Sequence, residues 1–132
     1  MPDAVHVLVA EDEFLAAMAI EDFLSLKGYR VTLAGDGQEA LERLREDPAD
    51  VVITDLRMPR MDGRGLIREI RGMDAALPVI VMTGYLTADT RDDALTDGSW
   101  RPLEILRKPV SPQEILSTLQ RMLGGAEGSP AA

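Results

Sequence analysis

Short apolar runs that alternate with amphipathic segments constrain the fold of this chain more than any other feature. Four of the runs are rich in Val, Ile and Leu with little alternation, and they lie at residues 5–10, 51–54, 79–82 and 103–106. Runs of this kind are typical of strands buried on both faces, as in a parallel sheet. A fifth run at residues 30–34 carries a charge and follows Gly28, which predicts a strand nearer the edge of the sheet.

Segments with helical spacing of their apolar residues lie between these runs. They are found at residues 16–24, 40–44, 66–70 and 115–123. Asp62 is suited to cap the helix at 66–70, and Ser111 followed by Pro112 is suited to start the last one. The segment 87–96 has few apolar residues, and we expect it to form a short or mobile helix.

This alternation of strand and helix predicts an α/β fold, a doubly wound parallel sheet of five strands with five helices on its two faces. The length of 132 residues is that of a single domain. We expect this domain to cover residues 1–123 and a disordered tail of small and polar residues to follow at 124–132.

The charge and composition of the chain limit the classes of molecule that it can bind. There are 23 acidic and 14 basic residues, and the resulting net charge of −9 repels nucleic-acid phosphates and anionic membranes. We therefore expect no direct contact with nucleic acid or membrane. The chain has no cysteine, which excludes disulfides and thiolate metal sites. No apolar stretch is long enough to cross a bilayer and no leader is visible, which predicts a cytoplasmic protein.

Polar side chains follow the ends of four predicted strands. Glu11 and Asp12 follow the first strand, Asp55 the third, Thr83 the fourth and Lys108 the fifth. Every strand of an open parallel sheet brings its carboxyl end to the same edge, where ligands bind. We therefore expect three carboxylates, a hydroxyl and an ammonium to meet there.

This set of groups is suited to phosphoryl transfer. Crowded carboxylates either hold a proton or bind a cation, and hard oxygen ligands with open positions suit Mg²⁺. Asp55 is the predicted nucleophile, because carboxylates form acyl phosphates. Glu11 and Asp12 are the predicted metal ligands, and Lys108 and Thr83 would contact phosphoryl oxygens.

Residues 5–123 resemble the receiver domains of response regulators, the CheY-like family. The most specific element runs from Asp55 to Gly63, DLRMPRMDG, which is similar to the family's phosphoacceptor strand end and following loop. The second element is Lys108-Pro109. The resemblance implies a flavodoxin-like fold with strand order 2-1-3-4-5, a cis bond before Pro109 and a metal contact from the backbone carbonyl of Arg57.

Two places depart from the family pattern. Receivers commonly carry Tyr or Phe three residues before the lysine, where this chain has Ile105, so the usual aromatic switch is missing. Thr83-Gly84-Tyr85 resembles a Phe-Ala-Thr-Gly-Tyr-like stretch in single-domain receivers of α-proteobacteria that act in general stress signalling, although the two preceding residues differ. We expect Gly84 to loosen this loop and Tyr85 to take over part of the switching role.

Plainer interpretations exist for the same residues. A single Asp at a strand end usually caps a helix or forms a turn, and Glu11 with Asp12 could merely begin the first helix. Lys108 could be a solvated surface charge. The surrounding motif favours a functional role for Asp55, and the shared sheet edge favours one for its companions.

Two further residues stand outside this set. His6, the single histidine, lies within the first strand, and we expect a structural role for it. Trp100 either anchors a partner protein or covers the sheet edge, and the sequence favours neither alternative.

The leading functional prediction is a stand-alone response regulator of a two-component phosphorelay. It would accept a phosphoryl group on Asp55 from a histidine kinase or histidine phosphotransfer protein, with Mg²⁺. Its output would come through binding an unknown downstream protein or through draining phosphate from a shared kinase, and the sequence favours neither. It would be a phosphoacceptor switch that promotes its own phosphorylation and dephosphorylation, and not a conventional enzyme.

Two alternatives come from other classes. A hydrolase with an aspartyl-phosphate intermediate is disfavoured, because Arg57 stands two residues after Asp55, where such phosphatases often place an acid. A phosphorylation-independent interaction module with a vestigial acidic pocket is disfavoured by the complete set of pocket residues, although Ile105 leaves some room for it.

Overall fold

The computed structural model describes residues 4–58, 60–84 and 98–124. All five predicted strands are present and parallel, in the order β2-β1-β3-β4-β5. Their bounds are β1 His6–Ala10, β2 Arg30–Ala34, β3 Val51–Asp55, β4 Val79–Thr83 and β5 Leu103–Arg107. The predicted strand order is therefore confirmed.

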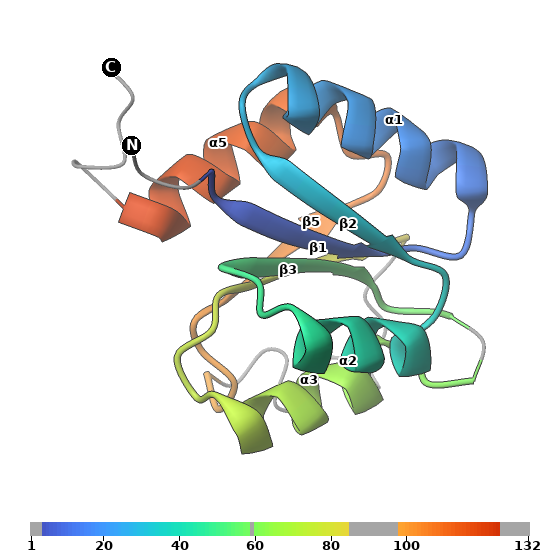
Figure 1. Ribbon diagram of the computed structural model, residues 1–132, viewed down its shortest axis with the longest axis vertical. Helices are drawn as coiled ribbons and strands as arrows, with labels where there is room; N and C mark the ends of the chain where they lie inside the picture. Colours follow the sequence, from blue (N-terminus) through green and yellow to red (C-terminus); the bar gives the residue numbers. More distant parts are fainter. Residues whose placement is uncertain (1–3, 59, 85–97, 125–132) are drawn as a thin grey trace.

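Four helices lie within the described residues, and they cover both faces of the sheet. They are α1 Phe14–Leu26, α2 Gly37–Glu46, α3 Gly63–Met73 and α5 Pro112–Gly124. Figure 1 shows α1 and α5 on one face of the sheet and α2 and α3 on the other. The helix expected at residues 87–96 lies outside the described residues. The last helix includes Gly124, one residue beyond the predicted domain end, and the remaining tail also lies outside the described part. None of the described helices has the length and hydropathy needed to span a bilayer.

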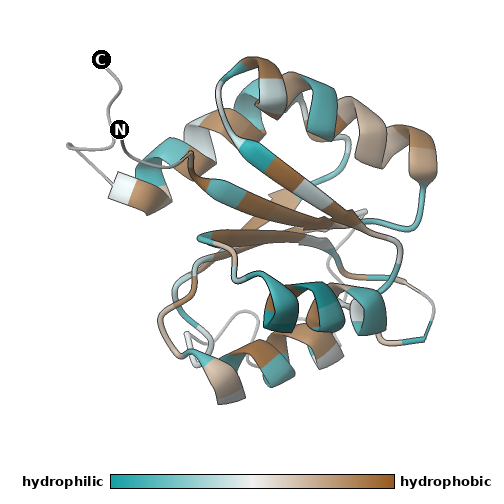
Figure 2. Ribbon diagram, viewed as in Figure 1, coloured by the Kyte–Doolittle hydropathy of each residue, from teal (hydrophilic) through white to brown (hydrophobic). Residues whose placement is uncertain are grey.

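The sheet separates two apolar core clusters. Alternate residues of β1 face opposite sides, because successive side chains of a strand point to opposite faces. Leu8 packs with the α2 and α3 side, whereas Val7 and Val9 pack with the α1 and α5 side. Figure 2 shows the apolar central strands between helices of mixed hydropathy. Burial on both faces explains why these strands appear in the sequence as continuous apolar runs.

The last strand is less buried than its sequence predicts. The strands β1, β3 and β4 are buried throughout, whereas the first four residues of β5 are half-buried and Arg107 is exposed. The physical reason is its place in the sheet, since among the described strands β5 lies at the edge and pairs with β4 alone. The expectation of an edge position for β2 is confirmed.

The predicted helix starts are confirmed by their caps. The side chain of Asp62 accepts a hydrogen bond from the backbone of Gly65 at 3.0 Å, at the start of α3. At α5, Ser111 Oγ accepts from the backbone N–H of Glu114, whose carboxylate in turn accepts from the backbone N–H of Ser111. These caps satisfy N–H groups that have no partner within a helix, and so they fix where each helix begins after its strand.

Candidate functional site

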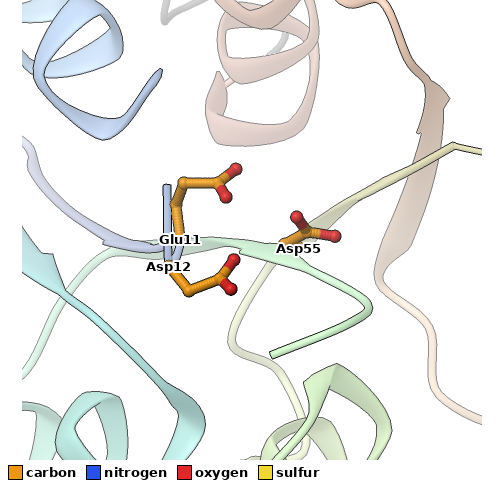
Figure 3. Close-up of side chains that lie close together, drawn as sticks. All are labelled: Glu11, Asp12 and Asp55. Atoms are coloured by element: carbon orange, nitrogen blue, oxygen red, sulfur yellow. The ribbon is translucent and has the colours of Figure 1, made fainter. Parts of the chain in front are cut away.

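Three carboxylates meet at the carboxyl edge of the sheet. Asp55 is the last residue of β3, and Glu11 and Asp12 directly follow the neighbouring strand β1. One carboxylate oxygen from each of the three lies within 4.8 Å of the others. Figure 3 shows the side chains of Glu11 and Asp12 directed toward the side on which Asp55 lies. The structure thus brings these three residues together, as their strand positions predict.

The ammonium of Lys108 reaches into this cluster from the end of β5. Its Nζ atom donates a hydrogen bond to Oδ2 of Asp55 at 2.7 Å and lies 3.6 Å from Oε1 of Glu11. Its backbone N–H donates to the carbonyl oxygen of Thr83 at 2.7 Å, which holds the residue against the end of β4. The peptide bond between Lys108 and Pro109 is cis, as the family resemblance implies.

Asp55 is held from its own loop as well. The backbone N–H of Arg57 donates to Oδ1 of Asp55 at 3.2 Å, so each oxygen of this carboxylate has a donor. Gly63 closes the loop by donating its N–H to the carbonyl oxygen of Leu56 at 2.9 Å. A Cβ at Gly63 would lie 2.5 Å from the carbonyl oxygen of Asp55, so only glycine permits this close approach. The predicted metal contact from the Arg57 carbonyl stays a prediction.

Burial sets the electrostatics of the cluster. Glu11 is only 3% exposed, and burial raises the pKa of its carboxyl from 4.5 to about 7. The backbone hydrogen bond from Glu13 opposes this rise and the nearby charge of Asp55 adds to it. Burial lowers the pKa of Lys108, but its hydrogen bond to Asp55 and the charge of Glu11 outweigh that effect and raise the pKa. Three carboxylates with one ammonium leave an excess of negative charge when all are ionised. This set of hard oxygen donors fits Mg²⁺, which prefers such ligands.

Thr83 lies at the same edge and is buried. It is the last residue of β4, and Asp55 pairs with the residue directly before it. Its predicted hydrogen bond to a phosphoryl oxygen stays a prediction.

The three predicted switch positions have different outcomes. Ile105 is half-buried in β5 and packs against the apolar cluster on the α2 and α3 side. Gly84 is exposed, and none of the described atoms lies within 4 Å of the position that a Cβ would take there. Close packing therefore does not demand glycine at this position. Tyr85 lies outside the described residues.

The two residues set apart in the sequence are both packed. The ring nitrogens of His6 lie 2.9 Å from the carbonyl oxygen of Pro48 and 2.7 Å from the hydroxyl of Thr32. These contacts agree with a structural role. Trp100 is half-buried against the cluster on the α2 and α3 side. This packing favours a Trp100 that covers the sheet edge over one that anchors a partner protein.

Sequence reasoning did not identify Asp36 and Arg60, which form an ion pair near the site. Arg60 belongs to the loop between Asp55 and α3, and Asp36 precedes α2. The sequence signal was that Asp36 is followed three residues later by Glu39, as at many helix starts. That signal locates a cap, but it does not indicate the partner 24 residues away.

An apolar cavity borders the carboxylate cluster. It has a volume of about 520 Å³ and lies between α1 and the start of α5. Ala19 and Ile20 of α1 and Ile115 of α5 contribute to its lining, and Glu11 and Lys108 lie in its wall. A molecule in this cavity would therefore touch the residues beside Asp55.

The chain is similar to known proteins over most of its length. Residues 7–120 match the response regulator receiver domain family. The chain is 36% identical over 121 residues to the transcriptional regulatory protein ZraR of Escherichia coli, covering 92% of this chain and 27% of ZraR. It is 33% identical over 129 residues to the response regulator MprA of Mycobacterium tuberculosis, covering 98% of this chain and 55% of MprA. The chain thus spans about a quarter to about half of the length of these curated relatives.

A solved structure shows the same fold with a metal ion. The receiver domain of sensor histidine kinase PA1611 from Pseudomonas aeruginosa has a magnesium ion coordinated in its active-site cleft. It superposes with a TM-score of 0.80 at 31% identity, covering 92% of this chain and 98% of that domain. From the match over residues 7–120 and this likeness, the chain belongs to the response regulator receiver domain family, whose members are phosphoacceptor switches.

Proposed function

We propose that Asp55 accepts a phosphoryl group from a histidine kinase or histidine phosphotransfer protein in a Mg²⁺-dependent reaction. The observation that carries this proposal is the position of Asp55. Its carboxylate stands between the Lys108 ammonium and the two other carboxylates, at the edge of the sheet where ligands bind. A carboxylate in such a place has a cation on one side and a suitable cation site on the other.

The proposed step forms one bond and breaks one. A carboxylate oxygen of Asp55 attacks the phosphorus of a phosphohistidine, a P–O bond forms, and the P–N bond breaks. The electron pair of the broken bond leaves with the donor's imidazole. Catalysis of such a transfer depends mainly on positioning and on balancing the negative charge of the phosphoryl oxygens.

Glu11, Asp12, Asp55 and the backbone carbonyl of Arg57 would hold Mg²⁺. When bound, the ion supplies positive charge that offsets the carboxylates and the phosphoryl oxygens. Burial raises the pKa of Glu11 even beside the Lys108 ammonium, so further positive charge would favour the ionised carboxylate. The donor set and the charge excess therefore support the same ion.

Lys108 and Thr83 would contact the transferred group. The Lys108 ammonium, hydrogen-bonded to Oδ2 of Asp55, would pair with a phosphoryl oxygen once the carboxylate charge is converted to an acyl phosphate. The hydroxyl of Thr83 would donate to another oxygen. A water molecule that attacks the acyl phosphate would reverse the modification, so we propose that the protein promotes its own dephosphorylation.

The cavity between α1 and α5 gives the phosphoryl donor a place to dock. It is continuous with the site through Glu11 and Lys108, and its other lining residues are largely apolar. Phe14 and Leu15, at the start of α1, are 69% and 80% exposed. We propose that the donor protein covers this surface while its phosphohistidine meets Asp55.

The output would be a change in affinity for a downstream protein, with Gly84, Tyr85 and Ile105 in the switch. A cytoplasmic location and the absence of direct nucleic-acid binding belong to this proposal, and the net charge of −9 supports the second of them. The stand-alone arrangement and the α-proteobacterial subgroup stay predictions. The direct test of the function is uptake of a phosphoryl group from acetyl phosphate, which needs no cognate kinase.

A further inference from the structure

The loop that follows Asp55 is tied to the start of α2 by a two-pronged ion pair. The guanidinium of Arg60 donates from Nε to Oδ2 of Asp36 at 2.8 Å and from Nη2 to Oδ1 at 3.2 Å. Oδ1 of Asp36 also accepts the backbone N–H of Glu39 at 2.8 Å and so caps α2. One carboxylate therefore holds both the helix start and the loop. The paired geometry is the strong form of this interaction.

A second contact joins the same two segments. The backbone N–H of Gly37 donates to the carbonyl oxygen of Met61 at 2.9 Å. A Cβ at Gly37 would lie only 2.1 Å from that oxygen, so the approach requires glycine. Arg60 has a φ of 65°, in the left-handed region that non-glycine residues seldom adopt. Two consecutive loop residues thus bind two consecutive residues at the start of α2.

The same loop touches the phosphoacceptor carboxylate. Arg57 donates its backbone N–H to Oδ1 of Asp55, and Gly63 packs against the backbone of Asp55 at the other end of the loop. A displacement of the loop would therefore change the donor on one oxygen of Asp55. Lys108 on the other oxygen would not be affected, because it follows β5 and is not part of this loop.

We propose that Asp36 and Arg60 are positioning residues that keep the loop after Asp55 in its Mg²⁺-binding arrangement. This inference rests on the proposed function. When only a fraction of molecules has a competent loop, the apparent affinity falls by that fraction, and saturating ligand restores the competent state. Loss of the ion pair therefore raises the Mg²⁺ concentration needed for half-maximal phosphorylation and leaves the rate at saturating Mg²⁺ nearly unchanged.

The experiment measures Mg²⁺ binding by calorimetric titration without a phosphoryl donor, and the rate of phosphorylation by acetyl phosphate as a function of Mg²⁺ concentration. Arg60→Gly removes the guanidinium and tolerates the φ of 65°. Asp36→Asn removes the charge and keeps a residue that caps helices well. The Arg60 side chain is largely exposed, which keeps the contribution of the pair modest despite its paired geometry, so we expect the half-saturating Mg²⁺ concentration to rise roughly two- to fivefold in each variant. The double variant should show no larger rise than the singles, because both remove the same contact.

Arg121→Ala is the matched control. It breaks an exposed ion pair with Glu104 that lies away from this loop, and the Mg²⁺ dependence should stay at the wild-type value. An unchanged half-saturating concentration in both single variants would overturn the inference, as would additive effects in the double variant or a loss confined to the saturating rate. If the wild type itself takes up no phosphoryl group, the proposed function fails and this inference fails with it.

Discussion

The Lys108 ammonium lies 2.7 Å from Oδ2 of Asp55; Lys108 directly follows β5 and Asp55 ends β3, and these strands are not neighbours in the sheet. The contact is possible because all parallel strands end at the same edge. In the unphosphorylated protein, Lys108 occupies one oxygen of the carboxylate that we propose as nucleophile. It therefore competes with a metal ion for the same negative charge.

Replacement of Lys108 by Ala should have two opposite effects. The phosphorylation rate with acetyl phosphate should fall by about a hundredfold, since one removed donor at a developing charge typically costs this much. Mg²⁺ should bind more tightly, because a positive charge beside the carboxylates is gone. Stopped-flow or quenched kinetics give the rate, and calorimetric titration gives the affinity.

The control for this prediction is Lys27→Ala, which removes the other lysine of the chain at the end of α1. It should leave both quantities unchanged. A Lys108→Ala protein that binds Mg²⁺ more weakly than the wild type would contradict the competition between the two cations.

The raised pKa of Glu11 predicts how stability depends on pH in the absence of metal. Its carboxyl ionises at about pH 4.5 when unfolded and at about 7 when folded, because burial raises the pKa. The unfolded state therefore loses its proton first as the pH rises. The free energy of unfolding should decrease between pH 4.5 and 7, by up to about 3 kcal/mol from this group.

Glu11→Gln isolates that contribution. Glutamine keeps an oxygen that can accept the backbone N–H of Glu13, as Glu11 does at 3.1 Å. Urea unfolding in EDTA at several pH values should show that the variant becomes more stable than the wild type above pH 7. Excess Mg²⁺ should reduce the difference by binding the wild type. Parallel stability curves for the two proteins would show that the Glu11 charge is not costly.

Thr83 should contribute through its hydroxyl alone. Thr83→Ser keeps the hydroxyl and should phosphorylate at nearly the wild-type rate. Thr83→Ala should be slower by roughly ten- to a hundredfold, the value of a hydrogen bond to a charged group. Both variants should bind Mg²⁺ as the wild type does in a calorimetric titration. Equal phosphorylation rates in the Ser and Ala variants would show that the Thr83 hydroxyl takes no part in the reaction.

A charge placed in the cavity between α1 and α5 should slow phosphoryl transfer from protein donors but not from small-molecule donors. Ala19→Glu places a carboxylate in the cavity wall, and we expect slower transfer from any histidine kinase that phosphorylates the wild type. Acetyl phosphate needs no docking surface, so its rate should not change. Ala75→Glu, in the turn between α3 and β4, is the matched control. If Ala19→Glu slowed transfer from both donors equally, the substitution would be acting on the reaction at Asp55 and not on docking of the kinase.

Much of the fold could be predicted because burial leaves a direct pattern in the sequence. The strands β1, β3 and β4 are mainly apolar and buried throughout, since both of their faces are covered, and Asp62 and Ser111 are placed where helices begin. The half-exposure of β5 could not be predicted in this way. Apart from Glu104, the run at residues 103–106 is apolar like that of a central strand, and the strand order shows that it lies at an edge.

The candidate site likewise has features that the sequence predicts and features that it does not. Glu11, Asp55 and Lys108 could be brought together from their strand ends, because the parallel sheet determines that meeting. The ion pair between Asp36 and Arg60 depends on how a loop folds against a helix start, which no periodicity records. The pKa of Glu11 likewise depends on the depth at which its carboxyl is buried.

Phosphorylation of Asp55 is tested most directly by intact-mass measurement after incubation with acetyl phosphate and Mg²⁺. The wild type should gain the mass of one phosphoryl group, EDTA should prevent the gain, and Asp55→Ala should abolish it. Asp22→Asn, an exposed acid on α1, should behave as the wild type does. An unmodified wild type, or a gain that persists in Asp55→Ala, would contradict Asp55 as the phosphoacceptor.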